Sequence, residues 1–251
     1  MEADPALTAY EAFAAVYNEF NHANDYEMWL GETLLPELRK HGLREGGKAL
    51  DVGCGTGRAF QPLLRRGWRI QGSDLSPAML ERAAEEGGAE VSLQAADMRD
   101  LPRFGEFDLV LSLNDSVNYL LGEDDLVRAL EGMKANLAEH GLLIFDVNSH
   151  LTYANQYAER HEVEHQGSSW VWDGRGEVAP SIFEAKISGD RLEPIQHLER
   201  FRPEGEVLEA MQTVGIRPLA SLGMSEEEGK VLLSEPPDEG RDYKVVFIGT
   251  A

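Results

Sequence analysis

A short apolar run followed at once by alternating glycines constrains this chain more than any other feature. Residues 49–52 read ALDV, and the next five residues are Gly53-Cys54-Gly55-Thr56-Gly57. A short apolar run that ends in glycine is typical of a buried strand. Glycine also lets the backbone turn sharply and approach a ligand closely. The pattern therefore predicts a strand that ends in a ligand-binding loop.

The chain after this loop alternates between strand-like and helix-like segments. Ser76 is suited to cap a helix, and Pro77 follows at the first helical position. The expected helices cover residues 58–66, 77–87 and 124–139, and the expected strands cover 49–52, 68–72, 91–95, 107–113 and 142–147. Strands separated by helices predict an α/β fold with a mostly parallel sheet and helices on both of its faces.

The two ends of the chain do not follow this alternation of strands and helices. Residues 5–41 place aromatic side chains at helical spacing, and after Asn148 the pattern favours antiparallel strands with a turn at Gly189-Asp190. The expected strands there cover 169–172, 181–188, 191–201, 216–222 and 243–248, with a helix near 206–214. We expect a single domain built from a helical cap (1–46), a core (47–149), an antiparallel insertion (about 160–202) and a last helix with terminal strands (203–251).

Acidic residues stand where the parallel strands end, which is where ligands bind in open sheets of this kind. Asp74 follows the second expected strand and can accept hydrogen bonds from two ribose hydroxyls, and Asp97 follows the third, where a carboxylate can accept from an adenine amino group. A dinucleotide-binding dehydrogenase is the main alternative. Its G-x-G-x-x-G fingerprint would require glycine where Arg58 stands, so this alternative is disfavoured.

Successive segments of the chain resemble the motifs of the class I S-adenosylmethionine-dependent methyltransferases. These segments are LDVGCGTG at 50–57, Asp74 with LSPAML, ADMRDLP at 96–102, FDLVLSLNDSVNYL at 107–120 and GLLIFDVNS at 141–149. Within the class, the chain is most similar to the glycine N-methyltransferase-like and amino-sugar N-methyltransferase group. The resemblance implies a Rossmann-like, seven-stranded sheet whose last strand is antiparallel.

The same resemblance implies which residues hold the cofactor, S-adenosylmethionine. The glycine loop would face its methionine part, Asp74 and Leu75 its ribose, and Asp97 and Met98 its adenine. The full set of implied cofactor residues is Tyr17, Gly53, Gly55, Gly57, Asp74, Leu75, Asp97, Met98, Leu113 and Ser116.

The expected activity is methyl transfer to a nitrogen or oxygen of a small molecule. The substrate pocket is expected between Asp115, Asn148 and the inserted strands, with Asp115 as the catalytic residue that orients an amine and takes its proton. The alternative for Asp115 is a turn-capping aspartate. A non-catalytic cofactor-binding protein and an aminopropyltransferase of the same fold also stay open.

Glycine is not the expected substrate. In the glycine N-methyltransferases that the chain resembles, an arginine just after the fifth strand grips the substrate carboxylate. Asn148 stands at about that position here, and asparagine cannot form the bidentate charged pair that arginine forms.

The charge balance disfavours nucleic acids and anionic membranes as partners. Asp and Glu number 45 against 23 Lys and Arg, for a net charge of -22, which repels phosphate backbones. The absence of a long apolar run or a basic leader, together with Cys54 as the only cysteine, favours a reducing, cytoplasmic setting. A homo-oligomer stays open.

The segment His161-Glu162-Val163-Glu164-His165 matches the H-E-x-x-H pattern of zinc proteases. That pattern needs a helix to bring both imidazoles onto one face, whereas these residues lead into an expected strand. We therefore expect no metal site. The triplet Glu226-Glu227-Glu228 is interpreted as a solvated helix end or loop, and Cys54 as a small residue that fills space.

Overall fold

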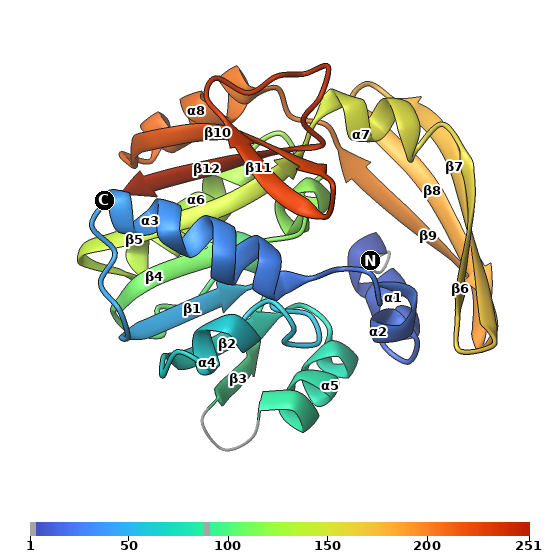
Figure 1. Cartoon of the computed structure of the whole chain (residues 1–251), viewed down its shortest axis with the longest axis horizontal. Coiled ribbons are helices and arrows are strands. Elements are labelled where there is room, and N and C mark those ends of the chain that lie inside the picture. The colour runs from blue at the N-terminus through green and yellow to red at the C-terminus, as the bar shows by residue number, and fades with distance from the viewer. Residues whose placement is uncertain (1–3, 88–90) are drawn as a thin grey trace.

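The computed structural model describes residues 4–87 and 91–251, so the first three residues of the cap and three residues of the core lie outside the description. The described part of the molecule contains two β-sheets with helices packed against them (Figure 1). The larger has eight strands in the order β11-β10-β12-β5-β4-β1-β2-β3, and the smaller has four in the order β6-β7-β8-β9.

The centre of the larger sheet is parallel, as the sequence predicts. Its parallel strands are β1 (Lys48–Val52), β2 (Arg69–Asp74), β3 (Val91–Ala95), β4 (Phe107–Ser112) and β5 (Leu137–Asn148). Because neighbouring residues of a strand point to opposite faces, buried residues on both faces show that this sheet is covered on both sides. In β4, Leu109 and Leu111 join one apolar cluster while Val110 joins the other.

Helices cover each face of this sheet. One face packs against η1 (Glu27–Leu34), a π-helix, and against α3 (Leu35–Lys40), α4 (Gln61–Leu64) and α5 (Pro77–Gly87). The other face packs against α6 (Asp125–Ala135) and α8 (Glu204–Thr213). The helix expected over residues 58–66 is shorter than predicted, because the residues before Gln61 form turns that continue the glycine loop.

The C-terminal edge of the sheet is antiparallel and has one strand more than the seven implied. β12 (Lys244–Thr250) pairs with β5, and β10 (Arg217–Glu227) pairs with β12. The extra strand is β11 (Lys230–Ser234), which returns along β10. The interpretation of residues 226–228 as a helix end or loop is therefore wrong for Glu226 and Glu227, which end β10. Gly229, with φ +71°, completes the hairpin turn.

The insertion is a sheet of its own beside the parallel core. It consists of β6 (Arg160–His165), β7 (Ser168–Ala179), β8 (Ile182–Gly189) and β9 (Leu192–Arg200), all antiparallel, as expected for this region. The short helix α7 (His150–Asn155), not expected from the sequence, connects β5 to β6.

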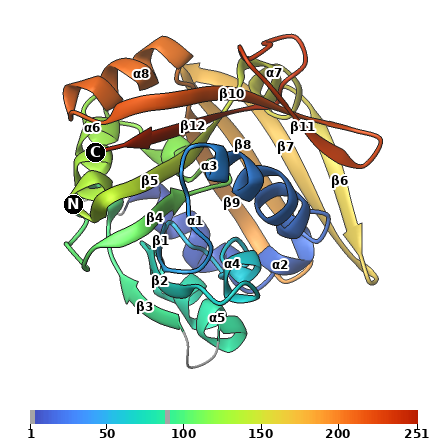
Figure 2. The same ribbon diagram turned by 60° about the vertical axis from the view of Figure 1, so that its left-hand side comes forward.

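The N-terminal helical segment divides between the two sheets. α1 (Pro5–Phe13) and α2 (Tyr17–Phe20) lie against the inserted sheet, where Phe13 and Val16 pack with Trp170 and Ile187. η1 and α3 instead join the core of the larger sheet through Leu30 and neighbouring leucines. Figures 1 and 2 show α1 and α2 between the two sheets, beyond the carboxyl ends of β1 and β2. No helix among the described residues is long and apolar enough to cross a membrane.

Candidate functional site

The loop after β1 forms the floor of a cavity. Gly53 has φ +74°, and a Cβ there would lie 2.9 Å from Ser116 Oγ, so only glycine fits between this loop and the end of β4. Gly55 has φ +53°, and a Cβ there would meet nothing within 4 Å because it would project into the cavity. A ligand in the cavity can therefore come close to the backbone of this loop.

Asp74 at the end of β2 lies beside the loop. Its Oδ2 accepts a hydrogen bond from the backbone N–H of Gly55 (2.8 Å), and its Oδ1 accepts from Ser76 N (2.9 Å). Burial raises the pKa of Asp74 above its ordinary value, and these backbone donors oppose the rise. The carboxylate is thereby held rigidly while each oxygen keeps a lone pair for a ligand hydroxyl.

Asp97 after β3 is held by a neighbouring arginine. Arg99 Nε donates to both carboxylate oxygens (2.8 and 3.0 Å), and Arg99 Nη2 also reaches Asp4 Oδ2 (2.6 Å). Burial raises the pKa of Asp97, but the hydrogen bonds from Arg99 outweigh it and hold the pKa below the ordinary value. Arg99 therefore fixes the acceptor expected at the adenine and ties it to the N-terminal segment.

These residues line one cavity of about 880 Å³, partly open to solvent. It contains nine of the ten residues that the sequence indicates for the cofactor: Tyr17, Gly53, Gly55, Asp74, Leu75, Asp97, Met98, Leu113 and Ser116. Gly57 lies outside the lining. A Cβ at Gly57 would lie 2.4 Å from the Phe60 ring, so this glycine allows close packing beneath the loop.

The N-terminal segment closes over this cavity through contacts that the sequence did not indicate. Arg58 donates to the backbone oxygens of Asn21 and Asn24, at 2.6 Å each, and its guanidinium lies 5.5 Å from the centre of the Tyr26 ring. Thr56 Oγ1 donates to Asn18 Oδ1 (2.6 Å). The glycine loop thus holds the segment that carries Tyr17.

Asp115 stands in a strained turn after β4. Asn114 and Asp115 have φ +63° and +60°, and Asp146 Oδ2 and Oδ1 accept from their respective backbone N–H groups at 2.7 Å. The Asp115 side chain makes no capping hydrogen bond to the short 3-10 helix η4 (Ser116–Tyr119). The capping alternative for Asp115 is therefore wrong, because its carboxylate accepts from Lys244 instead, while Asp146 holds the backbone N–H groups of the turn before η4.

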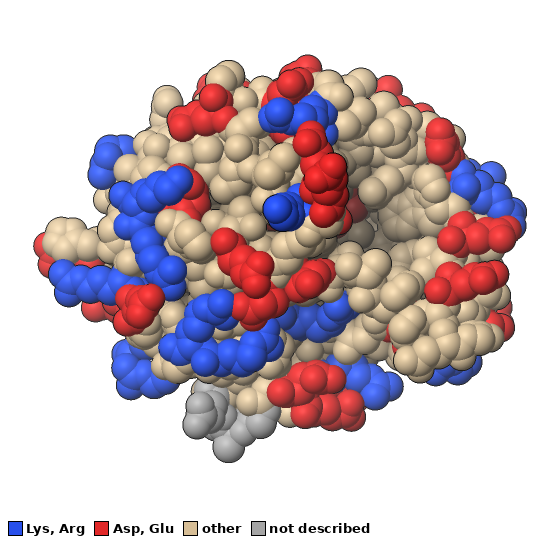
Figure 3. Space-filling view, in the orientation of Figure 1, with Lys and Arg blue, Asp and Glu red and all other residues tan. Residues whose placement is uncertain are grey.

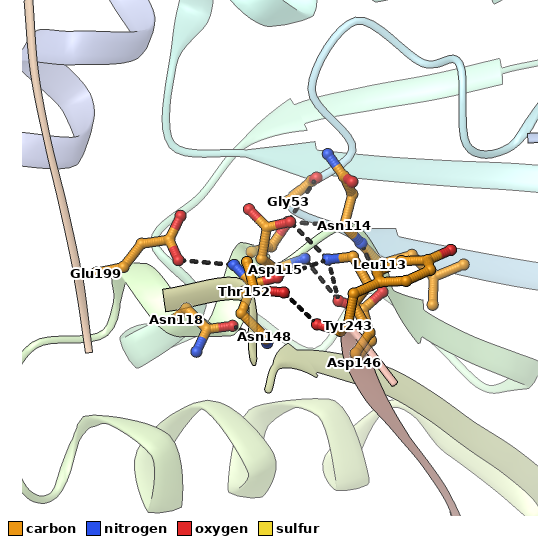
Figure 4. A network of polar contacts seen from close by, with 12 residues as sticks. Gly53, Leu113, Asn114, Asp115, Asn118, Asp146, Asn148, Thr152, Glu199 and Tyr243 are labelled. Atoms are coloured by element: carbon orange, nitrogen blue, oxygen red, sulfur yellow. Dashed lines mark hydrogen bonds and ion pairs between the residues drawn. The ribbon is translucent and has the colours of Figure 1, made fainter. Parts of the chain in front are cut away.

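The Asp115 carboxylate meets a buried lysine that the sequence analysis missed. Lys244 Nζ lies 2.6 Å from Asp115 Oδ1, 3.1 Å from Asp146 Oδ1 and 3.2 Å from Asn148 Oδ1. Figure 4 shows these three partners close together. Burial raises the pKa of Asp115 to about 7, with Lys244 opposing the rise. Asp115 thus holds a proton more readily than an ordinary carboxylate does.

A second cavity, of about 1510 Å³ and open to solvent, lies where the sequence analysis expects the substrate pocket. Asp115 and Asn148 line it, together with side chains of the inserted sheet such as Trp172 and Glu199. Four residues line both cavities: Tyr10, Tyr17, Asn114 and Tyr119. The surface in Figure 3 is hollowed between the larger sheet and the inserted sheet. The two cavities therefore adjoin at the end of β4.

His197 and Glu199 of β9 also lie in the second cavity and were not predicted. Both are almost completely buried, and His197 Nδ1 lies 2.9 Å from the Tyr119 hydroxyl. Burial lowers the pKa of His197 to about 4, so its imidazole is neutral at pH 7. Side chains of a strand alternate between its two faces, so His197 and Glu199 lie on the same buried face as Ile195. Two polar residues at buried positions of an expected strand were the sequence signal that could have indicated them.

The H-E-x-x-H segment itself forms strand β6, and the strand expected after it is β7. His161 pairs with Trp172 in the ladder and lines the second cavity, whereas His165 stacks on His22 with ring centres 4.2 Å apart. The two imidazoles lie in different surroundings. Among residues 4–87 and 91–251, no group of three or more His, Cys, Asp or Glu side chains is placed to hold a metal ion.

Comparison with known sequences identifies relatives over much of the chain. A family model described as a methyltransferase domain matches residues 49–141. A glycine/sarcosine N-methyltransferase of Parasynechococcus marenigrum is 32% identical over 204 residues, which cover 77% of this chain and 70% of that protein. A candidate methyltransferase of Bacillus subtilis is 31% identical over 169 residues, 65% of each chain, and one of a Geobacillus species is matched over 58% of its length. The chain therefore spans less than two thirds of these last two relatives.

Solved structures share the fold across nearly the whole chain. An S-adenosylmethionine-dependent methyltransferase from Clostridium acetobutylicum superposes with a TM-score of 0.77 at 21% identity, covering 96% of this chain and 98% of the other. An amino pentose methyltransferase from Micromonospora echinaspora, solved with its cofactor bound, gives 0.71 at 20% identity and covers 95% of both chains.

Proposed function

The chain belongs to the S-adenosylmethionine-dependent methyltransferases, and on this premise we propose that it transfers a methyl group from S-adenosylmethionine to the amine nitrogen of a small molecule. The observation that carries the proposal is the junction of the two cavities. Tyr17 and Asn114 line both, so a methyl group carried in the first cavity can meet a nucleophile held in the second.

We assign the first cavity to the cofactor. Asp74 would accept from the ribose hydroxyls, Asp97 and Met98 would frame the adenine, and the backbone at Gly53 and Gly55 would face the methionine part. When bound, the cofactor supplies a methyl group on an electrophilic sulfonium. The remaining task of the protein is positioning, which can contribute about 7–11 kcal/mol to lowering a barrier.

In the second cavity, Asp115 would orient the acceptor nitrogen. The bound cofactor would supply the methyl group to a neutral nitrogen and leave as S-adenosylhomocysteine, and the methylated ammonium would have to lose a proton before another transfer. The pKa of Asp115, about 7, suits a group that accepts a hydrogen bond or a proton from nitrogen near neutral pH. Lys244 and Asp146 fix its position.

Nitrogen is favoured over oxygen because the second cavity carries more acids than bases. Asp115, Glu199 and Glu226 line it against a single lysine, Lys244, and such a cavity attracts protonated amines. Relatives point the same way: one is named as a glycine/sarcosine N-methyltransferase and another as an amino-sugar N,N-dimethyltransferase.

Glycine itself stays an unexpected substrate. Within the described residues no arginine lines the second cavity, and Asn148 faces Lys244 and Glu199 rather than a free cation. A substrate carboxylate would therefore lie among carboxylates. Amines that carry hydroxyl groups fit better, since the cavity presents aromatic rings and neutral hydrogen-bonding side chains such as Tyr119 and His197.

The wider organisation follows from the same proposal. We infer a single domain, in which α1 and α2 of the cap (1–46) and the insertion at about 160–202 together form the roof of the core site. The partner is a small molecule, and the acidic surface disfavours nucleic acids and anionic membranes. A cytoplasmic location fits the single, buried Cys54.

Methyl transfer can be tested directly with S-adenosylmethionine that carries a deuterated methyl group. The protein is incubated with hydroxylated amines, amino sugars and glycine, and products are detected by mass spectrometry. We expect a labelled methyl group on at least one amine and none on glycine. Cofactor binding without transfer would support the non-catalytic alternative, and aminopropyl transfer from the decarboxylated cofactor would support the other.

Asp115→Asn separates a role in transfer from a role in folding. Turnover should fall about tenfold or more, equivalent to about 1.4 kcal/mol in the barrier, because the amide accepts no proton. Affinity for S-adenosylhomocysteine and thermal stability should stay near the wild-type values. Full activity in this variant would contradict the assignment of Asp115.

A further inference from the structure

The buried charges around the second cavity do not balance. Three carboxylates, those of Asp115, Asp146 and Glu199, share one hydrogen-bonded network with one ammonium, that of Lys244, which contacts the two aspartates directly and Glu199 only through Asn148. His197 adds no positive charge, since burial lowers its pKa to about 4. With every carboxylate ionised, the group therefore carries two negative charges in excess.

Lys244 cannot serve all three acids. An ammonium has three N–H donors, and Lys244 directs them to Asp115, Asp146 and the Asn148 amide oxygen. Its nearest acid is Asp115, at 2.6 Å. The positive charge of Lys244 is thus used on the two aspartates and compensates Asp115 in particular.

Glu199 is left with neutral partners only. Its Oε2 accepts from Asn148 Nδ2 at 2.8 Å and from the Tyr153 hydroxyl at 3.0 Å. Its residue is only 2% exposed, yet no lysine or arginine of the described chain forms an ion pair with it. Figure 4 shows Glu199 joined to the rest of the network through Asn148 alone. A buried carboxylate without a cation is costly unless a ligand brings the missing charge.

The surroundings of Glu199 suit an organic cation. The rings of Tyr10, Tyr119 and Trp172 line the same cavity, and aromatic faces attract cations once water is displaced. Burial raises the pKa of Glu199, opposed by hydrogen bonds from Asn148 and Tyr153 and by the more distant charge of Lys244. A cation bound beside it would hold the carboxylate in its ionised form.

We propose that Glu199 is the anchor for the positively charged amine of the substrate, while Asp115, already paired with Lys244, orients the reacting nitrogen. This inference rests on the proposed transfer to an amine and adds the residue that selects a cation. Because Asn148 contacts both Glu199 and Lys244, an amine held by Glu199 lies next to Asp115 and the cofactor junction.

The test measures ligand binding rather than turnover. Protein saturated with S-adenosylhomocysteine is titrated at pH 7 with benzylamine, which is a cation, and with benzyl alcohol, its neutral counterpart. Wild-type protein should prefer benzylamine by about tenfold or more. In Glu199→Gln, which keeps the shape and the acceptor for Asn148, this preference should disappear while affinity for S-adenosylhomocysteine is unchanged.

Glu193→Gln is the matched control, because Glu193 lies on the same strand as Glu199 but is exposed and lines neither cavity. It should retain the preference for benzylamine. Absence of a preference in the wild-type protein, or an equal loss in both variants, would overturn the proposal.

Failure of the proposed methyl transfer can be told apart from failure of the Glu199 assignment. If no amine is methylated although Glu199 determines benzylamine binding, the anchor stands and the transfer does not. If amines are methylated and Glu199→Gln leaves kcat/KM unchanged, the anchor is wrong.

Discussion

Replacing Lys244 with methionine removes the cation that pairs with Asp115 and Asp146 while keeping a side chain of similar length. Lys244 is 4% exposed and contacts both Asp115 and Asp146. Breaking a buried ion pair by removing one partner costs about 3–5 kcal/mol, because the remaining charge stays in the interior. Here two carboxylates lose their partner, so we expect the free energy of unfolding at pH 8 to fall by about 3–5 kcal/mol.

The loss should depend on pH, in a direction that the pKa of Asp115 fixes. Burial raises that pKa from its ordinary value of 3.8 to about 7, and Lys244 opposes the rise. An acid whose pKa is higher in the folded protein stabilises the fold at low pH, and this contribution is lost as pH rises toward the folded pKa. Without Lys244 the pKa of Asp115 rises further. The variant should therefore be closer to wild type at pH 5 than at pH 8.

Urea denaturation at pH 5 and pH 8 measures both effects. Lys230→Met is the matched control, since Lys230 is exposed on β11, and it should change the free energy of unfolding by less than about 0.5 kcal/mol. A loss in Lys244→Met below about 1 kcal/mol at pH 8, or a loss of equal size at both pH values, would refute the reasoning.

Three further predictions concern the ribose carboxylate, a buried acid of β1 and the histidine pair. Asp74→Ala should weaken S-adenosylhomocysteine binding by about 1.5–3 kcal/mol in calorimetry; unchanged affinity would count against the ribose assignment. Burial raises the pKa of Asp51 to about 8, so the contribution of Asp51 to stability declines as pH rises from about 4 to 8. Asp51→Asn should raise Tm more at pH 8 than at pH 5, and a smaller gain at pH 8 would argue against this. Elemental analysis should find no stoichiometric zinc; one zinc per chain, lost in His161→Ala, would show a metal site.

The sequence was most informative where local pattern and burial agree. Residues 91–95 were predicted as a strand and form β3 with the same bounds, and the helix at 77–87 was predicted with its Ser76 cap. Glycines and acids at strand ends are local features, and the topology of a parallel sheet brings such ends together. The residues of the cofactor cavity could therefore be predicted from the sequence alone.

The substrate cavity required long-range contacts that no local pattern encodes. Lys244 lies 129 residues from Asp115 in the chain, and Glu199 lies 51 residues from Asn148. A lysine at the start of an apolar strand and a glutamate at an inward position each violate the usual pattern of burial. Lys244 and Glu199 meet their partners only because the fold brings β12 and β9 close to the turn after β4.

The strand-rich C-terminal region was less predictable for a different reason. Strand β11 is short and carries the exposed Lys230 and Leu232, so it lacks the apolar alternation of a half-buried strand. The hairpin depends on Gly229, whose positive φ is a turn feature that the acidic triplet before it obscured.

Binding of a bisubstrate analogue tests most directly whether the two cavities act as one site for methyl transfer to an amine. The analogue is S-adenosylhomocysteine with nitrogen in place of sulfur and a short aminoalkyl arm on that nitrogen, titrated by calorimetry against S-adenosylhomocysteine itself. We predict binding at least about tenfold tighter than that of S-adenosylhomocysteine, with the gain lost in the Asp115→Asn, Glu199→Gln double variant. An analogue that binds no more tightly, or whose gain survives in the double variant, would contradict a shared site.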